Sequence, residues 1–541
     1  MTNKLSISAV FILFIFALTS CNPAQDVEND ASDNTEQPGQ GLDSDLDSGS
    51  SSDSSSDNHH ANLMYSEYPS NCIDCHADEA NQVHASTHYK WLGQAPDMAN
   101  ATFILQGKLT NAINSYCINI EGDWASCGTC HAGRGKRPDD ISAGLENIDC
   151  LVCHNEDYAT ARKRLPDGSM GVDNPVDSMV QNIQEPTRAS CLSCHAKAGG
   201  GDGVKRGDLS LALVNNNDKH FDYHMSSSGA NLSCQDCHSF EDHRVIGKGS
   251  DIQPTDDIAR GAELSCTNCH ANDINEHPSE VRNHLDHVAC QSCHIPYYAK
   301  VATETHREWT RHHDGTDATT CSEANPCPGH PYTEKASNLI PEYKWWNRRS
   351  DNYLLHDDAS RTYNVDKNTY PTSTPLGNVS DGKLYPFKYK TATQPITTAD
   401  KRLIALDTFE YLKNTGNVTT SVEKGLVNMG YTASEPFQWI TTDTYQLINH
   451  GVGDEDDHLS CNDCHNNTSR MDLQGSLGYQ LKGAKSVVCA QCHDGEELSE
   501  IVNGEKDYNY RSIHDKHVDS KRNDCSWCHS FSRPERNLKM P

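Results

Sequence analysis

The chain has 541 residues, of which 35 % are hydrophobic, and its mean hydropathy is −0.73. A chain this polar cannot build the ordinary hydrophobic cores of two or three domains, so another source of apolar bulk is required. The formal charge of −31 argues against nucleic acid as a partner, because nucleic acid requires a basic face.

The first residues predict an export signal with a lipidation site. The apolar run 7–18 is too short to span a membrane and is typical of a signal-peptide core. Its ending Leu-Thr-Ser-Cys at 18–21 resembles a bacterial lipobox, which implies a signal peptide over 1–20 and lipid on Cys21. A plain secretory signal is the alternative. Asn22 after the Cys is similar to an outer-membrane sorting signal.

Residues 21–65 predict a disordered acidic tether. They are rich in Asp, Ser, Asn, Gln and Gly and cannot bury enough apolar surface to fold. The tandem His59-His60 lies in this tether and is expected to be idle. Export predicts an oxidising location, periplasmic or at the cell surface, with the lipid anchor in the outer membrane.

Ten Cys-x-x-Cys-His pentapeptides follow, and each is an attachment motif for a c-type haem. The two thiols add to the porphyrin vinyl groups, and the adjacent His reaches the iron as its proximal ligand. Structural zinc sites use Cys-x-x-Cys pairs but have no need of a His after every pair. The sequence therefore predicts ten covalently bound haem c groups. The motifs are Cys72/Cys75/His76, Cys127/Cys130/His131, Cys150/Cys153/His154, Cys191/Cys194/His195, Cys234/Cys237/His238, Cys266/Cys269/His270, Cys290/Cys293/His294, Cys461/Cys464/His465, Cys489/Cys492/His493 and Cys525/Cys528/His529.

The density of motifs predicts the fold class. Seven motifs lie between Cys72 and His294, so most buried side chains there should contact a porphyrin and long regular elements are not expected. We expect a multihaem c-type cytochrome that is mostly irregular with α-helices, has little β structure and has a haem-dominated core.

Histidines outside the motifs supply candidates for the second axial ligand of each low-spin iron. Spacing alone does not tell which His serves which iron, and a bis-His iron carries electrons without doing bond chemistry. Many candidates precede a motif by a short interval. The candidates are His88, His224, His243, His277, His284, His450, His514 and His517, with His84, His220, His287 and His458 as neighbours.

Three further cysteines belong neither to a motif nor to the lipobox. Cys321 and Cys327 close a short loop, and a disulfide is expected in an oxidising compartment. Cys117 is left without a partner, and it is either a functional thiol or a small buried hydrophobe.

Several stretches, taken in chain order, resemble one known family. They are Ile113-Asn-Ser-Tyr-Cys117, Asn147-Ile-Asp-Cys-Leu-Val-Cys-His154, the Gly-rich segment 199–209, Cys234-Gln-Asp-Cys-His238, Val288-Ala-Cys-Gln-Ser-Cys-His-Ile-Pro296 and Ile448-Asn-His-Gly-Val452 leading into the motif at Cys461. Together they resemble the octahaem tetrathionate reductase family of c-type cytochromes. The resemblance covers residues 66–480 and eight of the ten motifs.

The resemblance implies one unusual iron, at the second motif. The catalytic residues it implies are Lys205 as an axial ligand in place of a histidine, His131 on the same iron and Cys117 close by. The Gly-rich segment before Lys205 would let the backbone approach a porphyrin closely, and desolvation would free the amine for iron.

The implied reaction is reduction of tetrathionate to thiosulfate in an eight-haem domain, residues 66–480, with nitrite or hydroxylamine as possible further substrates. The electron donor would be a periplasmic or membrane protein, and the oligomeric state is left open. Residues 481–541 add a diheme extension with His514 and His517 as expected ligands, and the Cys321–Cys327 loop is a possible insertion.

Two other readings remain. A lipid-anchored conduit for extracellular electron transfer would need no substrate site of its own. A hydroxylamine-oxidising octahaem enzyme shares the haem count but lacks the stretches quoted above, and the Cys-x-x-Cys-Lys motif of pentahaem nitrite reductases is absent from this sequence.

Overall fold

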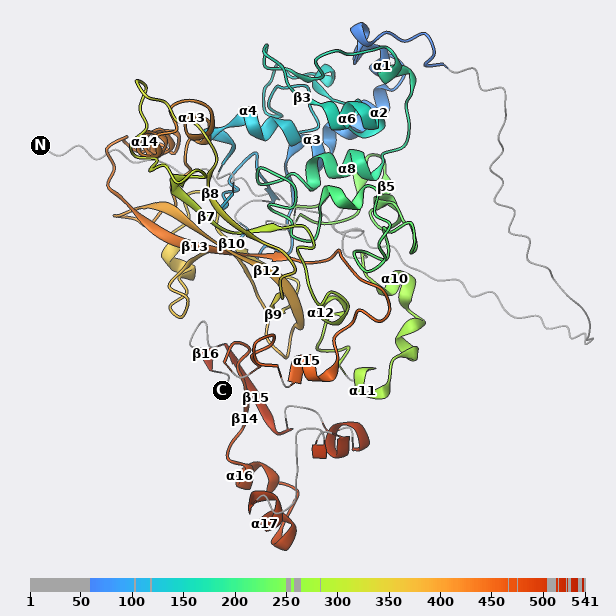
Figure 1. The fold of residues 1–541 in the computed structure, drawn as a ribbon, viewed down its shortest axis with the longest axis vertical. Coiled ribbons are helices and arrows are strands. Elements are labelled where there is room, and N and C mark those ends of the chain that lie inside the picture. The colour runs from blue at the N-terminus through green and yellow to red at the C-terminus, as the bar shows by residue number, and fades with distance from the viewer. Residues whose placement is uncertain are drawn as a thin grey trace, which may run out of the picture. The chain divides into compact units, whose positions relative to one another are not determined.

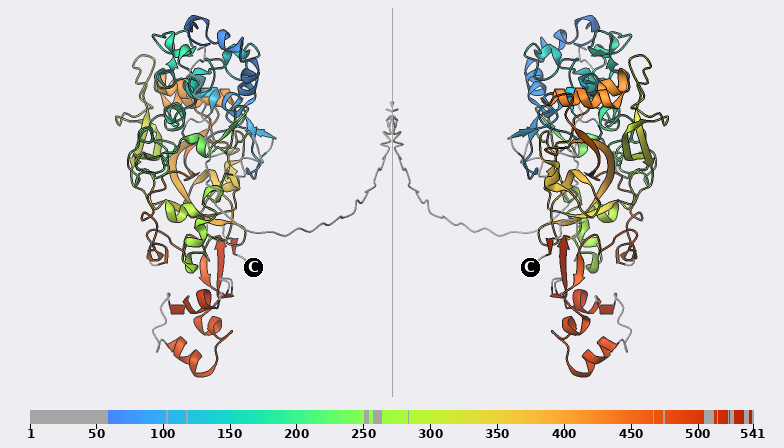
Figure 2. Two further views of the ribbon diagram at one scale, coloured as in Figure 1. Left: turned by 90° about the vertical axis from the view of Figure 1, so that its right-hand side faces the viewer. Right: turned by 90° about the vertical axis from the view of Figure 1, so that its left-hand side faces the viewer.

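The structure is a computed structural model, shown in Figures 1 and 2. It describes residues 59–101, 104–116, 119–249, 254–256, 264–282, 284–465, 467–473, 475–503, 512–513, 515–521, 523, 527–533 and 538–539. The predicted signal peptide, the lipidation site Cys21 and nearly all of the tether lie outside these ranges, as do Cys117, His514 and Cys525. In the ranges that the structure describes, no helix combines the length and apolar character needed to cross a membrane.

The part that carries the first seven motifs is built from short helices joined by irregular chain. The longest of its described helices, α2, has nine residues, and its described strands are two-residue pairs, in agreement with the expectation for a motif-rich stretch. The helices are α1 (Ser70–Ile73), α2 (Ala77–Ala85), α3 (Thr87–Lys90), α4 (Trp124–Cys127), α5 (Leu151–His154), α6 (Glu156–Ala161), α7 (Ser178–Gln181), α8 (Arg188–His195), α10 (Thr267–His270), α11 (Ser279–Arg282) and α12 (Cys290–His294). The strands are β1 (Gly93–Gln94), β2 (Leu105–Gln106), β3 (Lys163–Arg164), β4 (Met170–Gly171), β5 (Phe240–Glu241) and β6 (Arg244–Val245).

Many of the haem motifs coincide with a single helical turn. Helices α5, α8, α10 and α12 all end at a motif histidine, so the second thiol and the imidazole project from one turn. Side-chain caps fix where some turns begin: Thr187 accepts a hydrogen bond from the Ser190 amide, and Asp123 accepts one from Ser126. These caps hold the motif in place from its N-terminal side.

A seven-stranded sheet follows, in the stretch without motifs. Its order is β10-β11-β13-β12-β7-β8, and β9 also pairs with β12. The central pair β12 and β13 is antiparallel from Phe387↔Leu447 to Thr397↔Phe437, whereas β12 runs parallel to β7. The strands are β7 (Thr303–His312), β8 (Pro331–Ala336), β9 (Glu342–Trp346), β10 (Ser350–Asn352), β11 (Tyr370–Pro375), β12 (Lys383–Thr397) and β13 (Phe437–Leu447).

The length of these strands was not anticipated. The expectation of little β structure holds up to His294, but β12 alone has 15 residues. The physical reason is the absence of haem motifs over 295–460, because apolar side chains there must pack on one another.

A conventional hydrophobic core forms where helices α13 (Thr408–Lys413) and α14 (Val418–Asn428) cover the sheet, as Figure 1 shows beside β7 and β8. Trp309, Ile396 and Leu406 meet Tyr411 and Val422 in this core, and each is at most 1 % exposed. This core positions β7 and β12, whose other ends carry the charged residues described below.

The C-terminal part has α15 (Cys461–His465), α16 (Lys485–Cys489) and α17 (Gly495–Asn503), and a small sheet of β14 (Tyr479–Leu481), β15 (His529–Arg533) and β16 (Leu538–Lys539). Strand β14 pairs with β15 in the register Tyr479↔Phe531 to Leu481↔His529. The expected boundary between residues 480 and 481 therefore falls inside a strand.

Candidate functional site

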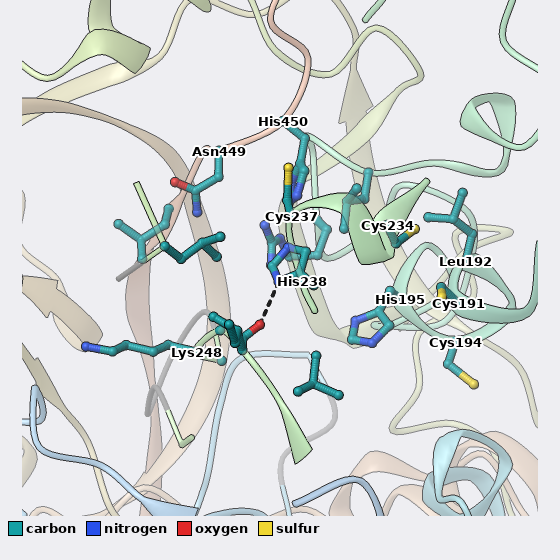
Figure 3. A pocket seen from close by; sticks show the side chains of 18 of the residues that line it. Cys191, Leu192, Cys194, His195, Cys234, Cys237, His238, Lys248, Asn449 and His450 are labelled. Carbon is teal, nitrogen blue, oxygen red and sulfur yellow. Dashed lines mark hydrogen bonds between the residues drawn. The ribbon is translucent and has the colours of Figure 1, made fainter. Parts of the chain in front are cut away.

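One continuous cavity joins the haem motifs. It has a volume of 4170 Å³ and is lined by both cysteines of each of the first seven motifs, and it reaches Cys461 of the eighth. Ligand pockets are usually about 300–1,000 Å³, so this space suits several large groups side by side. Figure 3 shows a part of it, where Cys191, His195 and Cys234 lie near His238 and His450.

The ninth motif differs from the first seven. Neither Cys489 nor Cys492 lines the cavity. Attachment of a haem through Cys492 therefore stays a prediction that rests on the motif itself.

Eight motif histidines face a second histidine ring in the described part of the chain. An imidazole on iron holds its ring centroid about 3 Å from the metal, so two rings on opposite sides lie about 6 Å apart. The observed centroid separations run from 5.7 to 6.4 Å and fit this arrangement. The pairs are His60–His76, His88–His195, His154–His243, His224–His270, His238–His450, His277–His294, His284–His465 and His493–His517.

The structure brings every described ligand candidate of the main set to a motif histidine. His514 is outside the described residues, and His294 also has His458 at 6.4 Å. His60 was expected to have no role. The structure contradicts this expectation, because the centroid of its ring lies 6.3 Å from that of the His76 ring. His60 precedes a motif by a short interval, like the other candidates, and this signal could have identified it.

The partners of the ring Nδ1 atoms support the same assignment. Nδ1 of His154 contacts the Gln184 carbonyl at 3.0 Å, and Nδ1 of His238 contacts that of Ile246 at 2.9 Å. A backbone carbonyl on Nδ1 leaves Nε2 available to a metal and fixes the plane of the ring. The residues present therefore fit haem iron at these positions.

His131 of the second motif has different surroundings. Among the described residues its ring contacts Tyr89, Trp91 and Trp124 at 4.9 to 5.4 Å, and no histidine ring. Its Nε2 lies 2.5 Å from the Tyr89 carbonyl, while the buried Nδ1 has no hydrogen-bond partner in the described part. Burial lowers the pKa of His131 to about 4, which keeps the imidazole neutral. Binding a metal through Nε2 requires the ring to turn and give Nδ1 to the carbonyl.

A cluster of cations surrounds Tyr116, which is 2 % exposed. Lys390 Nζ lies 4.0 Å from the centre of the Tyr116 ring, and Lys388 Nζ lies 5.5 Å from it. The Arg307 guanidinium carbon is at 5.5 Å and Lys205 Nζ at 5.9 Å. We call Lys205, Arg307, Lys388 and Lys390 the Tyr116 cation cluster. It combines favourable cation–π contacts with an excess of positive charge.

Strand geometry explains how the cluster forms. Lys388 and Lys390 are alternate residues of β12 and so project from the same face of the sheet. Arg307 comes from β7, which pairs with β12. Lys205 follows a loop with Gly199, Gly200 and Gly203 at positive φ, a backbone conformation that favours glycine.

Glu304 offsets part of this charge. It is fully buried and lies 2.7 Å from Arg307 and 3.2 Å from Lys390. Although burial raises the pKa of Glu304, Arg307 and Lys390 together hold it below its usual range. Burial, with Lys390 beside it, lowers the pKa of Lys388 well below its usual value. Even without charge on Lys388, the three cations Lys205, Arg307 and Lys390 outnumber the one carboxylate of Glu304, and this excess of positive charge favours binding of an additional anion.

Lys388 also fixes the backbone at the implied axial ligand. Its Nζ donates hydrogen bonds to the carbonyls of Val204 at 2.7 Å and Lys205 at 3.0 Å. Lys205 lines the cavity that Cys127 and Cys130 share with the cysteines of the other six motifs. Cys117 directly follows Tyr116 in the sequence but lies outside the described residues.

Sequence analysis missed Arg307, Lys388, Lys390 and Glu304. The alternation Lys388-Tyr-Lys390 in an otherwise buried strand was a usable signal, because lysine is almost never buried without a reason.

Known proteins resemble this chain in separate regions. A family model described as bacterial cytochrome c matches residues 305–468, and one for cytochrome c554 and c-prime matches residues 71–155. The chain is a c-type cytochrome with several covalently bound haem c groups. The crystal structure of octaheme cytochrome c from Shewanella oneidensis matches with a TM-score of 0.61 and 26 % identity, covering 76 % of this chain and 93 % of that one. An uncharacterized protein of Archaeoglobus fulgidus is 28 % identical over 221 residues, 32 % of this chain and 73 % of its own length.

Proposed function

We propose that this multihaem cytochrome collects electrons and reduces a small oxyanion, with tetrathionate as the first candidate substrate. The observation that carries the proposal is the Tyr116 cation cluster, of which Lys205 and Arg307 line the same cavity as Cys127 and Cys130. An anion held there would share the cavity with the second motif, whose His131 has no histidine ring against it among the described residues.

Reduction of tetrathionate takes two electrons, breaks the central sulfur–sulfur bond and releases two thiosulfate ions without any proton. The haem of the second motif supplies the electrons when bound. Negative charge on the substrate grows from two to four during the step, so preorganised cations stabilise the product side more than the substrate side. Arg307 lines the cavity and is proposed to contact the anion, and the buried Lys390 adds positive charge behind it.

The resemblance to the octahaem tetrathionate reductase family supports Lys205 as axial ligand. Hydrogen bonds from Lys388 to the carbonyls of Val204 and Lys205 support a fixed position for that backbone. Cys117, next to Tyr116 in the sequence, is proposed as a thiol that exchanges with a polysulfur anion.

Steady-state turnover of the purified holoprotein with a reduced viologen and tetrathionate tests this assignment. We expect Lys205→His to lower kcat at least tenfold. The matched control is Lys335→His on the exposed part of β8, which should keep full turnover. Unchanged turnover of Lys205→His would reject the lysine mechanism. Near-infrared magnetic circular dichroism gives a second readout, since one haem should lose its lysine signature in the variant.

The second candidate function is a conduit without substrate chemistry. The continuous cavity along seven motifs favours it, because neighbouring groups in one space can pass electrons over long distances. In this case the oxyanion would give no turnover in wild-type protein, while electron transfer to a soluble haem or mineral acceptor would remain. Nitrite and hydroxylamine are tested in the same assay as further substrates of the Tyr116 site.

We also propose that the protein is exported and anchored by lipid on Cys21, facing a periplasmic or membrane electron donor. The C-terminal pair His493–His517 is a proposed entry point for those electrons. Detergent partition of wild-type protein and of Cys21→Ala tests the anchor. The variant should move to the aqueous phase, whereas equal partition would contradict lipidation.

A further inference from the structure

Cys321 and Cys327 form a disulfide with a Cα separation of 5.6 Å. This pair lies beside a buried histidine: Cys321 Sγ is 3.6 Å from Nε2 of His312, and both residues are 2 % exposed. The same Nε2 donates a hydrogen bond to the Gly416 carbonyl at 2.9 Å. The proton on His312 is therefore next to the sulfur.

A short series of rings connects this histidine to the haem cavity. His312 packs on Tyr411 with ring centroids 4.6 Å apart, and Tyr411 contacts Trp309 at 5.1 Å. Trp309 lines the cavity that holds the haem motifs, and the Arg307 guanidinium of the Tyr116 cation cluster lies over its ring. Since electron tunnelling weakens steeply with distance, van der Waals contact at each step makes this a favourable path.

We propose that the Cys321–Cys327 disulfide is a two-electron redox centre that exchanges electrons with the haems through Tyr411 and Trp309. In the reducing direction, two ferrous irons become ferric, the sulfur–sulfur bond breaks and two protons are taken up. Cys321 takes up one proton from solvent, and the Nε2–H of His312, 3.6 Å from its Sγ, stabilises the thiolate that forms first. The second reaches the half-buried Cys327 directly from water.

The backbone around the disulfide is held independently of the sulfur–sulfur bond. The amide of Cys327 donates to the Thr415 carbonyl at 2.9 Å, and Asn417 Nδ2 donates to the Cys321 carbonyl at 2.6 Å. Gly416 lies so close to Cys327 that a β-carbon there would meet the Cys327 carbonyl oxygen at 2.3 Å. Opening the bond therefore leaves both thiols in place, and oxidation can close it again.

Counting electrons tests the proposal on the holoprotein without any substrate. Anaerobic coulometric titration should deliver two electrons more per chain than the haem content measured as pyridine haemochrome. The double variant Cys321→Ser/Cys327→Ser should accept only as many electrons per chain as it has haems. Equal uptake by the two proteins would overturn the proposal. So would one zinc per chain with both thiols reduced, because the three ligand atoms lie within 4.8 Å of one another and would then form a metal site.

The path is tested by reducing the haems, trapping the thiols that form with iodoacetamide and measuring the mass of the protein by mass spectrometry. Tyr411→Leu should slow the appearance of thiols at least tenfold, whereas Tyr411→Phe, which keeps the ring, should match wild type. Trp309→Leu should act like Tyr411→Leu at the other end of the path. Unchanged rates in both Leu variants, with full haem content, would overturn the relay.

Discussion

Asp208 accepts a hydrogen bond from Nδ1 of His450 at 3.0 Å, and its side chain is 1 % exposed. Although burial raises the pKa of Asp208, Arg206 and His450 together hold it well below its usual range. An ionised carboxylate on Nδ1 makes an imidazole a stronger donor to iron and stabilises the oxidised metal.

This pair predicts a low potential for the haem of Cys234 and Cys237, whose histidine faces His450. Asp208→Asn should raise that potential on the order of 50 mV, which is about 1.2 kcal/mol for one electron. Spectroelectrochemical titration measures it. Asp273→Asn, at the exposed His270 contact of 2.6 Å, should give a smaller shift, and an equal shift would contradict the role of burial.

The anion site predicts a specific effect of Lys390. Lys390→Gln removes one positive charge and leaves Glu304 paired with Arg307, so the protein should still fold. We expect KM for tetrathionate to rise about tenfold, the equivalent of about 1.4 kcal/mol. The control is Lys335→Gln, exposed on β8. If both variants keep the wild-type KM, the cluster does not bind substrate.

Arg162 is predicted to be critical for stability at the second motif. It donates to Asp149 at 2.6 Å and to the carbonyls of Thr129, His131 and Gly133. Arg162→Gln leaves a buried carboxylate without its ion pair and should cost about 3 to 5 kcal/mol. The exposed pair of Arg311 and Glu308 offers a comparison, where Arg311→Gln should cost less than about 1 kcal/mol. Denaturant midpoints of the two variant holoproteins measure these losses of stability. A similar loss in both variants would contradict the critical role of the buried Arg162.

The lowered pKa of Glu410 predicts that the part of the protein around the seven-stranded sheet loses stability in acid. Burial raises the pKa of Glu410, but hydrogen bonds from Lys424, Thr415 and Asn414 outweigh it and lower the pKa to about 2. A depressed pKa contributes stability above the usual value of 4.5, and that contribution is lost as the pH falls toward 2. We expect a loss of about 2 to 3 kcal/mol over this window.

Unfolding measured from pH 6 to pH 2 in wild type and in Glu410→Gln tests this loss of stability. The variant should be less stable at pH 6, and the difference should shrink toward pH 2. A constant difference would mean that Glu410 does not titrate in this range.

Local spacing was enough to find most of the histidines that face a motif histidine, but not their pairing. A histidine shortly before a motif marks a ligand candidate, yet His88 lies against His195 and His284 against His465. Such pairs depend on the path of irregular chain around the haems, which has no periodic signal in sequence. The Cys321–Cys327 disulfide was predicted correctly, because a seven-residue loop forces the two cysteines together.

The cation cluster escaped prediction for a different reason. Strand β12 has Lys388 and Lys390 on its buried face, and charged residues there conceal the alternation that marks a half-buried strand. Burial of such residues is tolerated only where Glu304 and backbone carbonyls pair with them. The residues that hid the strand from sequence analysis are the ones that define the proposed anion site.

The single cavity along the first seven motifs has a consequence for how the protein matures. Its walls come from short helices that pack in small hydrophobic clusters of three to five buried residues, so this half of the chain has little to collapse onto before the cofactors are attached. The haem-attachment machinery therefore meets an open polypeptide in which every thiol pair is accessible. Loss of one motif would remove a shared wall, and the damage would extend to neighbouring cofactors.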